Sequence, residues 1–278
     1  MELRGSCTTS SSIVVPDGMT LDGRGHAIVA IDPDADTFRG GIVVARGGFA
    51  SVINTVVTAA GLADVCHGGA ERLRGIYFEG ASGIIRDNRI EHVNKAGSVC
   101  QEGNGIEVRN STNTDVPVTV EISGNIVARY QKSGVVIHGH VDAYMHLNVI
   151  GASAAQALVP ANAIQVGPLA KARIVANVIT GNTFAGTESA GTAVLLVDTA
   201  PGTLVSGNSI EGGDVGIHVL ASGAAIEDNE LTDAEPDGAY DVGIVNLGEG
   251  NLFGNNTVRG YRTRYYGIES AAKSQQVE

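Results

Sequence analysis

The sequence predicts an all-β chain in which short strands wind into a stack of similar coils. One signal is a six-residue pattern, apolar-x-x-Asn-x-apolar, seen most clearly in residues 85–90, Ile-Arg-Asp-Asn-Arg-Ile. The other is a Gly or Ala followed by an alternating apolar strand, as in residues 105–108, Gly-Ile-Glu-Val. The two signals alternate along the chain, so each unit is expected to run strand, turn, strand, Asn, strand and loop.

Both signals recur about eight times with variable spacing. The Asn positions are Asn54, in a weaker first copy, then Asn88, Asn125, Asn148, Asn177, Asn208, Asn229 and Asn256. The alternating strands begin at Gly41, Gly75, Gly105, Gly134, Ala163, Ala193, Gly216 and Gly243. A constant core pattern with variable spacing places the insertions in loops, as in stacked repeats. No stretch sustains the 3.6-residue period of a helix, which excludes helical repeats.

The elements follow in order from the N-terminus. Residues 1–12 precede the stack, and the apolar segments 13–15, 19–21 and 27–31 predict its opening coil. In the later units, inward Ile, Val and Leu are expected to stack at about 4.8 Å per coil. Each repeated Asn is expected at a bend that favours left-handed backbone, with its amide bonded to the same amide one coil away. This arrangement is an asparagine ladder.

The C-terminal end is expected to close the stack. Residues 259–266 hold a cluster of aromatic and basic side chains, which we predict to cap the open edges of the last coil. The coils then occupy residues 13–268 of a single domain, and residues 269–278 form a polar, flexible tail.

Residues 13–268 resemble the right-handed parallel β-helix proteins, which include pectate lyases, polygalacturonases, mannuronan epimerases and phage tailspikes. The resemblance rests on the Gly-Ile-x-Val strands, the Asn bends and the opening residues 21–28, Leu-Asp-Gly-Arg-Gly-His-Ala-Ile. It implies a single-stranded right-handed parallel β-helix of about nine or ten coils. Because this fold carries lyases, hydrolases, epimerases and inert scaffolds, it implies the architecture more narrowly than the reaction.

Charge and hydropathy limit the partners. The 278 residues include 18 Lys and Arg against 30 Asp and Glu, a formal charge of −12, so we expect no nucleic-acid partner. No apolar run approaches the roughly 20 residues that cross a bilayer, so no membrane span is expected. The first four residues, Met-Glu-Leu-Arg, do not open a signal peptide.

The resemblance implies a substrate cleft on the outer face of the strand that begins each unit. The alternation predicts two parallel files of outward side chains on this face. The first file is Val43, Tyr77, Glu107, Val136, Gln165, Leu195, His218 and Val245. The second file is Ala45, Glu79, Arg109, His138, Gly167, Val197, Leu220 and Leu247. Polar residues gather on the early coils, and the later coils turn apolar.

The polar residues admit three interpretations. Glu79 and Glu107 lie on neighbouring coils and could serve as acid and base in glycoside hydrolysis. His138 or Arg109 could instead take the proton next to a sugar carboxylate in a β-elimination. Ion pairs among Glu79, Glu107 and Arg109 on a solvated β-face explain the same residues without chemistry.

These interpretations give an order of expectations. First comes a carbohydrate-active enzyme of lyase, hydrolase or epimerase type acting on an oligo- or polysaccharide. Its catalytic residues are Glu79, Glu107, Arg109 and His138, and its substrate-binding residues are Tyr77, His140, Gln165 and His218. The alternative is a non-catalytic binding or surface-structural module whose apolar cleft-side face meets a partner or a second copy. A weaker alternative is an isomerase or cyclase of a small hydrophobic substrate.

Four features count against a specific carbohydrate-active family or a metal. The Asp-Asp and Gly-His-Gly motifs of polygalacturonases and the Arg-x-Pro-x-x-Arg motif of pectate lyases are absent, as is Trp, which stacks on sugars. His138 and His140, predicted on the same side of one strand, lack an evident third ligand, and three cysteines without C-x-x-C spacing do not indicate zinc. We expect no cofactor, and no motif indicates calcium.

Two cysteines bear on the compartment. Cys66 and Cys100 fall in consecutive loops, where a disulfide and a pair of reduced thiols fit the sequence equally well. A bridge would favour a secreted or periplasmic protein.

Overall fold

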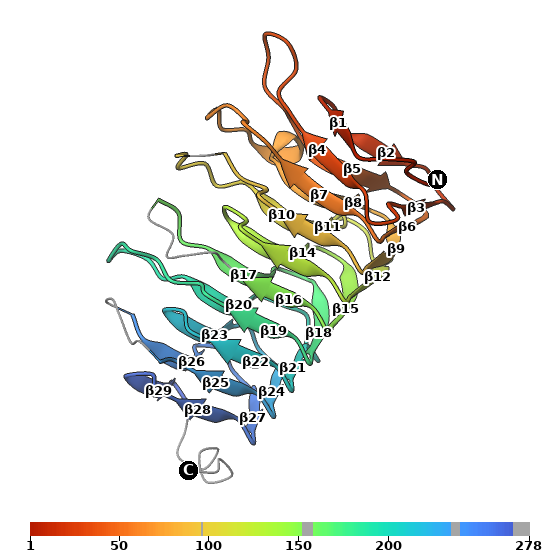
Figure 1. Ribbon diagram of the computed structural model, residues 1–278. Coiled ribbons are helices and arrows are strands. Elements are labelled where there is room, and N and C mark those ends of the chain that lie inside the picture. The colour runs from red at the N-terminus through yellow and green to blue at the C-terminus, as the bar shows by residue number, and fades with distance from the viewer. Residues whose placement is uncertain (96, 152–157, 235–239, 269–278) are drawn as a thin grey trace.

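The chain winds as a right-handed parallel β-helix (Figure 1). The computed structural model describes residues 1–95, 97–151, 158–234 and 240–268. Within these residues the strands form three parallel sheets of ten, ten and nine strands, joined by turns, loops and one short 3-10 helix, η1 (Gly69–Glu71). The first strands, β1 and β2, lie at one end of the stack, and β28 and β29 lie at the other (Figure 1). The predicted all-β class and parallel coil are confirmed.

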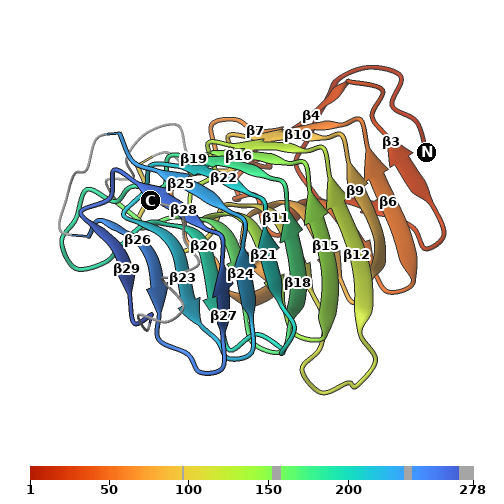
Figure 2. The same cartoon turned by 90° about the horizontal axis from the view of Figure 1, so that it is seen from below.

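Each coil contributes one strand to each sheet, in the order sheet II, sheet III, sheet I. Sheet I contains β1 (Cys7–Thr9), β4 (Ala27–Ala30), β7 (Val56–Ala59), β10 (Arg89–Glu91), β13 (Ile126–Ala128), β16 (Val149–Gly151), β19 (Val178–Thr180), β22 (Ser209–Glu211), β25 (Glu230–Thr232) and β28 (Thr257–Arg259). Sheet II contains β2 (Ile13–Val15), β5 (Gly41–Arg46), β8 (Arg74–Glu79), β11 (Asn104–Arg109), β14 (Ser133–His138), β17 (Asn162–Val166), β20 (Thr192–Val197), β23 (Val215–Leu220), β26 (Val242–Asn246) and β29 (Thr263–Tyr266). Sheet III contains β3 (Thr20–Asp22), β6 (Phe49–Ile53), β9 (Ser82–Arg86), β12 (Val118–Ser123), β15 (Val141–His146), β18 (Lys171–Val175), β21 (Leu204–Ser206), β24 (Ala225–Glu227) and β27 (Leu252–Gly254). The strands of sheet III lie side by side in Figure 2.

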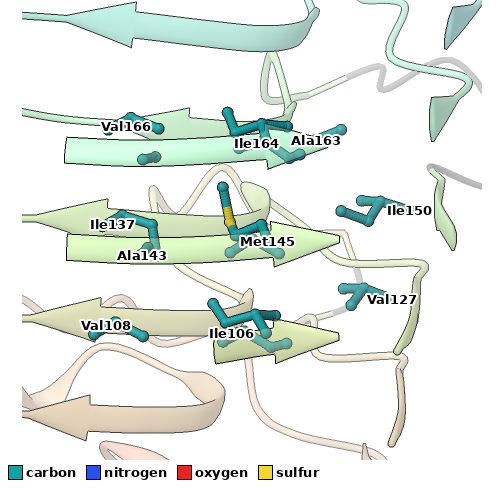
Figure 3. Packing of buried hydrophobic residues seen from close by; sticks show 14 of the residues in the cluster. Ile106, Val108, Val127, Ile137, Ala143, Met145, Ile150, Ala163, Ile164 and Val166 are labelled. Atoms are coloured by element: carbon teal, nitrogen blue, oxygen red, sulfur yellow. The ribbon is translucent and has the colours of Figure 1, made fainter. Parts of the chain in front are cut away.

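The core is a column of apolar side chains enclosed by the three sheets. Ile106 and Val108 of one coil pair in register with Val135 and Ile137 of the next, so like residues lie above one another. Figure 3 shows Val108, Ile137 and Val166 in one such stack, with Val127 and Ile150 entering from sheet I. All five of these side chains are buried, and burial of a Val or Ile side chain stabilises a fold by about 1.5–3 kcal/mol.

An asparagine ladder runs along the bend between sheets III and I. The Nδ2 of Asn88 donates to the Oδ1 of Asn125 at 3.0 Å, and the same bond repeats through Asn148, Asn177, Asn208, Asn229 and Asn256 at 2.9 to 3.0 Å. Each Oδ1 also accepts the backbone N–H of the preceding rung. The rungs are at most 2% exposed, so this network satisfies polar groups that water cannot reach. The predicted ladder is confirmed.

Two details of the predicted bend were wrong. The first rung is Thr55, whose backbone N–H donates to Asn88, and not Asn54, which is exposed one residue earlier. The left-handed backbone also belongs to the residue before each rung, such as Leu147 (φ 56°) and Asp228 (φ 56°). The rung Asn is therefore selected for its amide, and the residue before it carries the strain.

The C-terminal cluster was also misplaced. Residues 263–266 form β29, which pairs in parallel with β26, and Tyr261 is buried in the core. The cluster is therefore part of the last described coil and not a cap over it. The predicted tail, residues 269–278, lies outside the described residues.

The long loops between sheets I and II hold a disulfide and a buried ion pair. Cys66 and Cys100 are bonded to each other across consecutive coils. Beside them, Lys95 Nζ lies 2.9 Å from Glu102, whose other oxygen accepts the N–H of Leu73 at 2.6 Å. Lys95 and Glu102 are buried, so these contacts fix the loops against the start of sheet II.

Candidate functional site

The outer face of sheet II carries three files of side chains, one more than the alternation predicts. The additional file comes from the residue before each corner Gly or Ala, and includes Arg74, Asn104, Ser133, Asn162 and Thr192. A Cβ on Gly75 would lie 2.4 Å from the carbonyl oxygen of Gly105, so the corner needs a small residue and the alternation breaks there. The recurring polar residue before Gly was the available signal for this file.

Strand β5, which supplies the first member of both files, is shifted by one residue relative to the prediction. Val43 and Ala45 pair with Ile76 and Phe78 and are buried in the core. The outward residues of β5 are instead Val44 and Arg46. Gly41, which the prediction aligned with Gly75, instead pairs with Arg74. This position holds glycine because a side chain there would meet Tyr77.

Glu107 is the centre of a buried ion cluster. Its carboxylate accepts from Arg74 Nε at 2.7 Å, Arg74 Nη2 at 3.2 Å, Asn104 Nδ2 at 2.8 Å and Arg109 Nε at 3.0 Å. Burial would raise the pKa of Glu107, but the hydrogen bonds and charge of Arg74, with the charge of Arg109, hold the pKa below its ordinary value. Glu107 is 1% exposed, so a ligand on the sheet face cannot reach it without displacing its neighbours.

Arg74 also explains the position of Tyr77. The Arg74 guanidinium lies 4.3 Å from the centre of the Tyr77 ring and donates to the carbonyls of Gly69, Ala70 and Arg72 in the loop above. Tyr77 is therefore buried on the outer face of the sheet, and its ring has no open side for a sugar. Burial, with a smaller contribution from Glu79, raises the pKa of Tyr77 to about 12.

Glu79 lies at the end of β8, the strand of Arg74 and Tyr77, on the solvent-exposed side of the ion cluster. Its carboxylate pairs with Arg46 on the preceding coil at 2.9 Å, and both side chains are close to half exposed. Glu79 and Glu107 therefore differ sharply: one is accessible to solvent, and the other is enclosed by its partners.

Arg109 and His138 face solvent on adjacent coils. They are register partners in β11 and β14, which places them about 4.8 Å apart along the stack. The Arg109 side chain is 38% exposed, and its Nε–H donates to Glu107. Its two terminal nitrogens have no partner among the described residues. Burial, and then the charge of Arg109, lower the pKa of His138, so its neutral form is favoured at neutral pH. Gly167 on the next coil leaves room for the imidazole.

The remaining predicted binding residues lie apart from one another. β14 ends at His138, and Gly139 turns the chain, so His140 lies outside the strand and does not share a face with His138 as predicted. Gln165 is half-buried one coil beyond Val136, where its Oε1 accepts from Asn162 at 3.2 Å. His218 lies three coils beyond His138 and belongs to a different feature of the face.

An apolar pocket of about 630 Å³ occupies the C-terminal half of the same face. Its floor is formed by outward residues of β20, β23 and β26, among them Leu195, Leu220 and Val245, with His218 between them. The loops that enter sheet II form one wall, including Pro160 and Tyr240. The predicted apolar half of the face is thus hollowed.

The described residues offer one group with metal-ligating atoms close together, Cys66, Cys100 and Glu102. Both sulfurs are bonded to each other, and Glu102 is occupied by Lys95 and two backbone N–H groups. These atoms are already used in the fold, so this group does not suit a metal ion. In the described part of the chain no helix has the length and apolar character to cross a bilayer.

Comparison with known proteins identifies the architecture. Residues 39–277 match the family described as right handed beta helix region. A crystal structure of the Dettilon tailspike protein is similar, with 13% sequence identity and a TM-score of 0.41 over 94% of this chain, which spans 60% of the tailspike's length. A search of curated proteins found no match.

Proposed function

The chain belongs to the right-handed β-helix family, and on that premise we propose that it binds and cleaves an acidic oligo- or polysaccharide by β-elimination on the outer face of sheet II. The observation that carries the proposal is the pair Arg109 and His138. Arg109 presents its two terminal guanidinium nitrogens, which have no partner among the described residues, beside a histidine whose neutral form is favoured. A fork of this kind binds a carboxylate with two parallel hydrogen bonds, and a neutral imidazole can accept a proton.

The two residues divide the chemistry. Arg109 binds the sugar carboxylate and stabilises the negative charge that develops on it. His138 takes the proton from the carbon next to that carboxylate, and the freed electron pair forms a double bond to the neighbouring ring carbon. The bond from that carbon to the glycosidic oxygen breaks, and the oxygen takes a proton from water.

The other residues have supporting roles in this proposal. Glu107 positions Arg109 through its 3.0 Å bond, and Arg74 fixes Glu107 in turn. Hydrolysis by Glu79 and Glu107 as acid and base has less support, because all lone-pair directions of the Glu107 carboxylate are occupied. In this proposal Glu79 and Arg46 contact the glycan on the side of Arg109 that faces the N-terminal coils.

The experiment is a screen of uronate-containing and neutral polysaccharides for unsaturated ends, read by their ultraviolet absorbance. The wild type is expected to release unsaturated products from a uronate glycan only. His138→Ala is expected to lower the rate by about 100-fold or more, since general base catalysis contributes on this scale. Arg109→Lys keeps the charge but loses the fork, so it should bind substrate more weakly than the wild type.

Matched controls are available on sheet III. His146→Ala and Arg173→Gln change the same residue types on β15 and β18, away from this face, and should leave the rate unchanged. If no uronate glycan is cleaved but the wild type binds one and Arg109→Gln does not, the non-catalytic binding module is the correct alternative. If neither binding nor cleavage occurs, the proposal is wrong.

The disulfide adds a proposal on compartment. A Cys66–Cys100 bridge persists in oxidising surroundings, which supports a secreted or periplasmic protein. Fractionation of cells that express the full-length gene product would test this, and a purely cytoplasmic protein would contradict it.

A further inference from the structure

The apolar pocket on the C-terminal half of sheet II lies outside the proposed glycan site. Its volume of about 630 Å³ falls in the range of small-molecule sites, roughly 300–1,000 Å³. Leu195, Leu220, Val245 and Leu247 form an apolar floor, so the pocket suits a molecule with an apolar body. A glycan chain, which is polar on its edges, has few partners there.

One end of the pocket carries a cation that has no counterion in the described part of the chain. Lys132 lines the pocket, and its Nζ donates to the carbonyl oxygen of Pro160 at 2.8 Å. None of the described residues that line the pocket is Asp or Glu, and none of them forms an ion pair with Lys132. An ammonium has three N–H donors, so two of them remain for a ligand.

A second lysine, Lys95, shows how this fold pairs a buried ammonium with a carboxylate. Lys95 is buried beside Glu102 at 2.9 Å, a contact that offsets the cost of removing both charges from water. Lys132 is half-buried with no such partner, and burial lowers its pKa. An anionic ligand group would supply the missing partner.

The floor of the pocket carries one polar side chain. His218 lies between Leu195 and Val245 of the neighbouring coils, its Nε2 is buried, and that atom has no hydrogen-bond partner among the described residues. A charged imidazole would need to donate from both nitrogens, so the unpaired Nε2 favours the neutral ring. The floor therefore adds no charge, and among the lining residues that the structure describes the one cation is Lys132.

We propose that this pocket binds an amphipathic organic anion, with its apolar body on the leucine floor and its acid group at Lys132. The inference does not depend on β-elimination by His138. It requires only the shape and charge of the pocket.

The test is displacement of anilinonaphthalenesulfonate, an apolar anion that fluoresces in apolar sites. Octanoate, octanol and octylammonium are used as competitors, so that only the charge of the head group differs. Octanoate is expected to displace the dye best and octylammonium least. Lys132→Gln should weaken octanoate by about tenfold, the scale of one charged hydrogen bond, and change octanol by less than about twofold.

Two variants test the location. Leu220→Glu places a carboxylate on the floor and should abolish dye binding, whereas Leu252→Glu makes the same change on sheet III and should not. Lys171→Gln is the control for Lys132→Gln, and urea midpoints verify that each variant is folded. Equal competition by octanoate and octylammonium, an unaffected Leu220→Glu, or no saturable binding would each overturn the proposal.

His138→Ala separates the two proposals. It should lower the rate of glycan cleavage by about 100-fold or more and leave octanoate binding unchanged.

Discussion

Replacement of Asn148 by Ala tests how much one rung of the ladder stabilises the fold. The Oδ1 of Asn148 accepts from the backbone N and the Nδ2 of Asn125, each at 3.0 Å. Its Nδ2 donates to Ile122 O and to Asn177 Oδ1, each at 2.9 Å. The substitution therefore removes four buried hydrogen bonds. At about 1 kcal/mol each, the free energy of unfolding should fall by about 4 kcal/mol, a large part of the 5–15 kcal/mol typical of a domain.

Urea unfolding followed by circular dichroism would measure this loss. Asn113→Ala is the matched control, because Asn113 is exposed in a loop, and it should change stability by less than about 0.5 kcal/mol. The reasoning would be refuted by a loss below about 1 kcal/mol for Asn148→Ala, since water or a shifted backbone would then replace the rung at little cost.

Four other predictions follow from single features. Glu107→Gln leaves the Arg74 charge buried without its counterion and should cost about 3 kcal/mol in urea; a loss below about 1 kcal/mol would contradict the buried pair. Reduction of the Cys66–Cys100 bridge, which closes a 34-residue separation, should cost about 3–4 kcal/mol, and the double Ala variant should no longer respond to reductant. Leu147→Asn places a residue that tolerates φ 56° and should stabilise the fold by up to about 1 kcal/mol, where a loss would show that this backbone is not strained. Burial lowers the pKa of His218 from 6.5, so below pH 6.5 the unfolded state binds a proton more readily than the folded state, and stability falls as the pH falls. His218→Gln removes this group, so urea midpoints measured across pH should decrease less steeply toward low pH than those of the wild type.

The repeats predicted the fold because register is encoded at every coil. The rungs favour Asn and the corners favour Gly or Ala, and the alternation of these two signals locates all three strands of a unit. The coil of β5 to β7 departs from this pattern, since Thr55 replaces Asn at the rung and Gly41 lies one place early, so Val43 and Ala45 were assigned to the wrong face. A shift of one residue reverses every side chain in a strand.

The site was less predictable because burial on a sheet face depends on the loops. Strand periodicity correctly predicted that Glu107 and Tyr77 point outward. Both are nevertheless buried, because Arg74 contacts them and is bonded to the loop that contains Gly69 and Arg72. Nothing in the local sequence of β11 shows that this loop lies above it. The apolar pocket depends in the same way on loop residues such as Pro160 and Tyr240.

The small residue at the sheet II corners from β8 to β26 has a consequence for how recognition can change. Gly75 and Gly105 bring neighbouring backbones together and leave no space for a Cβ, so these positions are fixed by the scaffold. The residue immediately before each one points away from the core, and its identity ranges from Arg74 through Asn104 to Val215 along the stack. From β8 to β26 the fold thus places a small corner residue beside a variable outward one in each coil. A substitution in this row can therefore change which ligand the outer face of sheet II binds, one coil at a time, without repacking the interior.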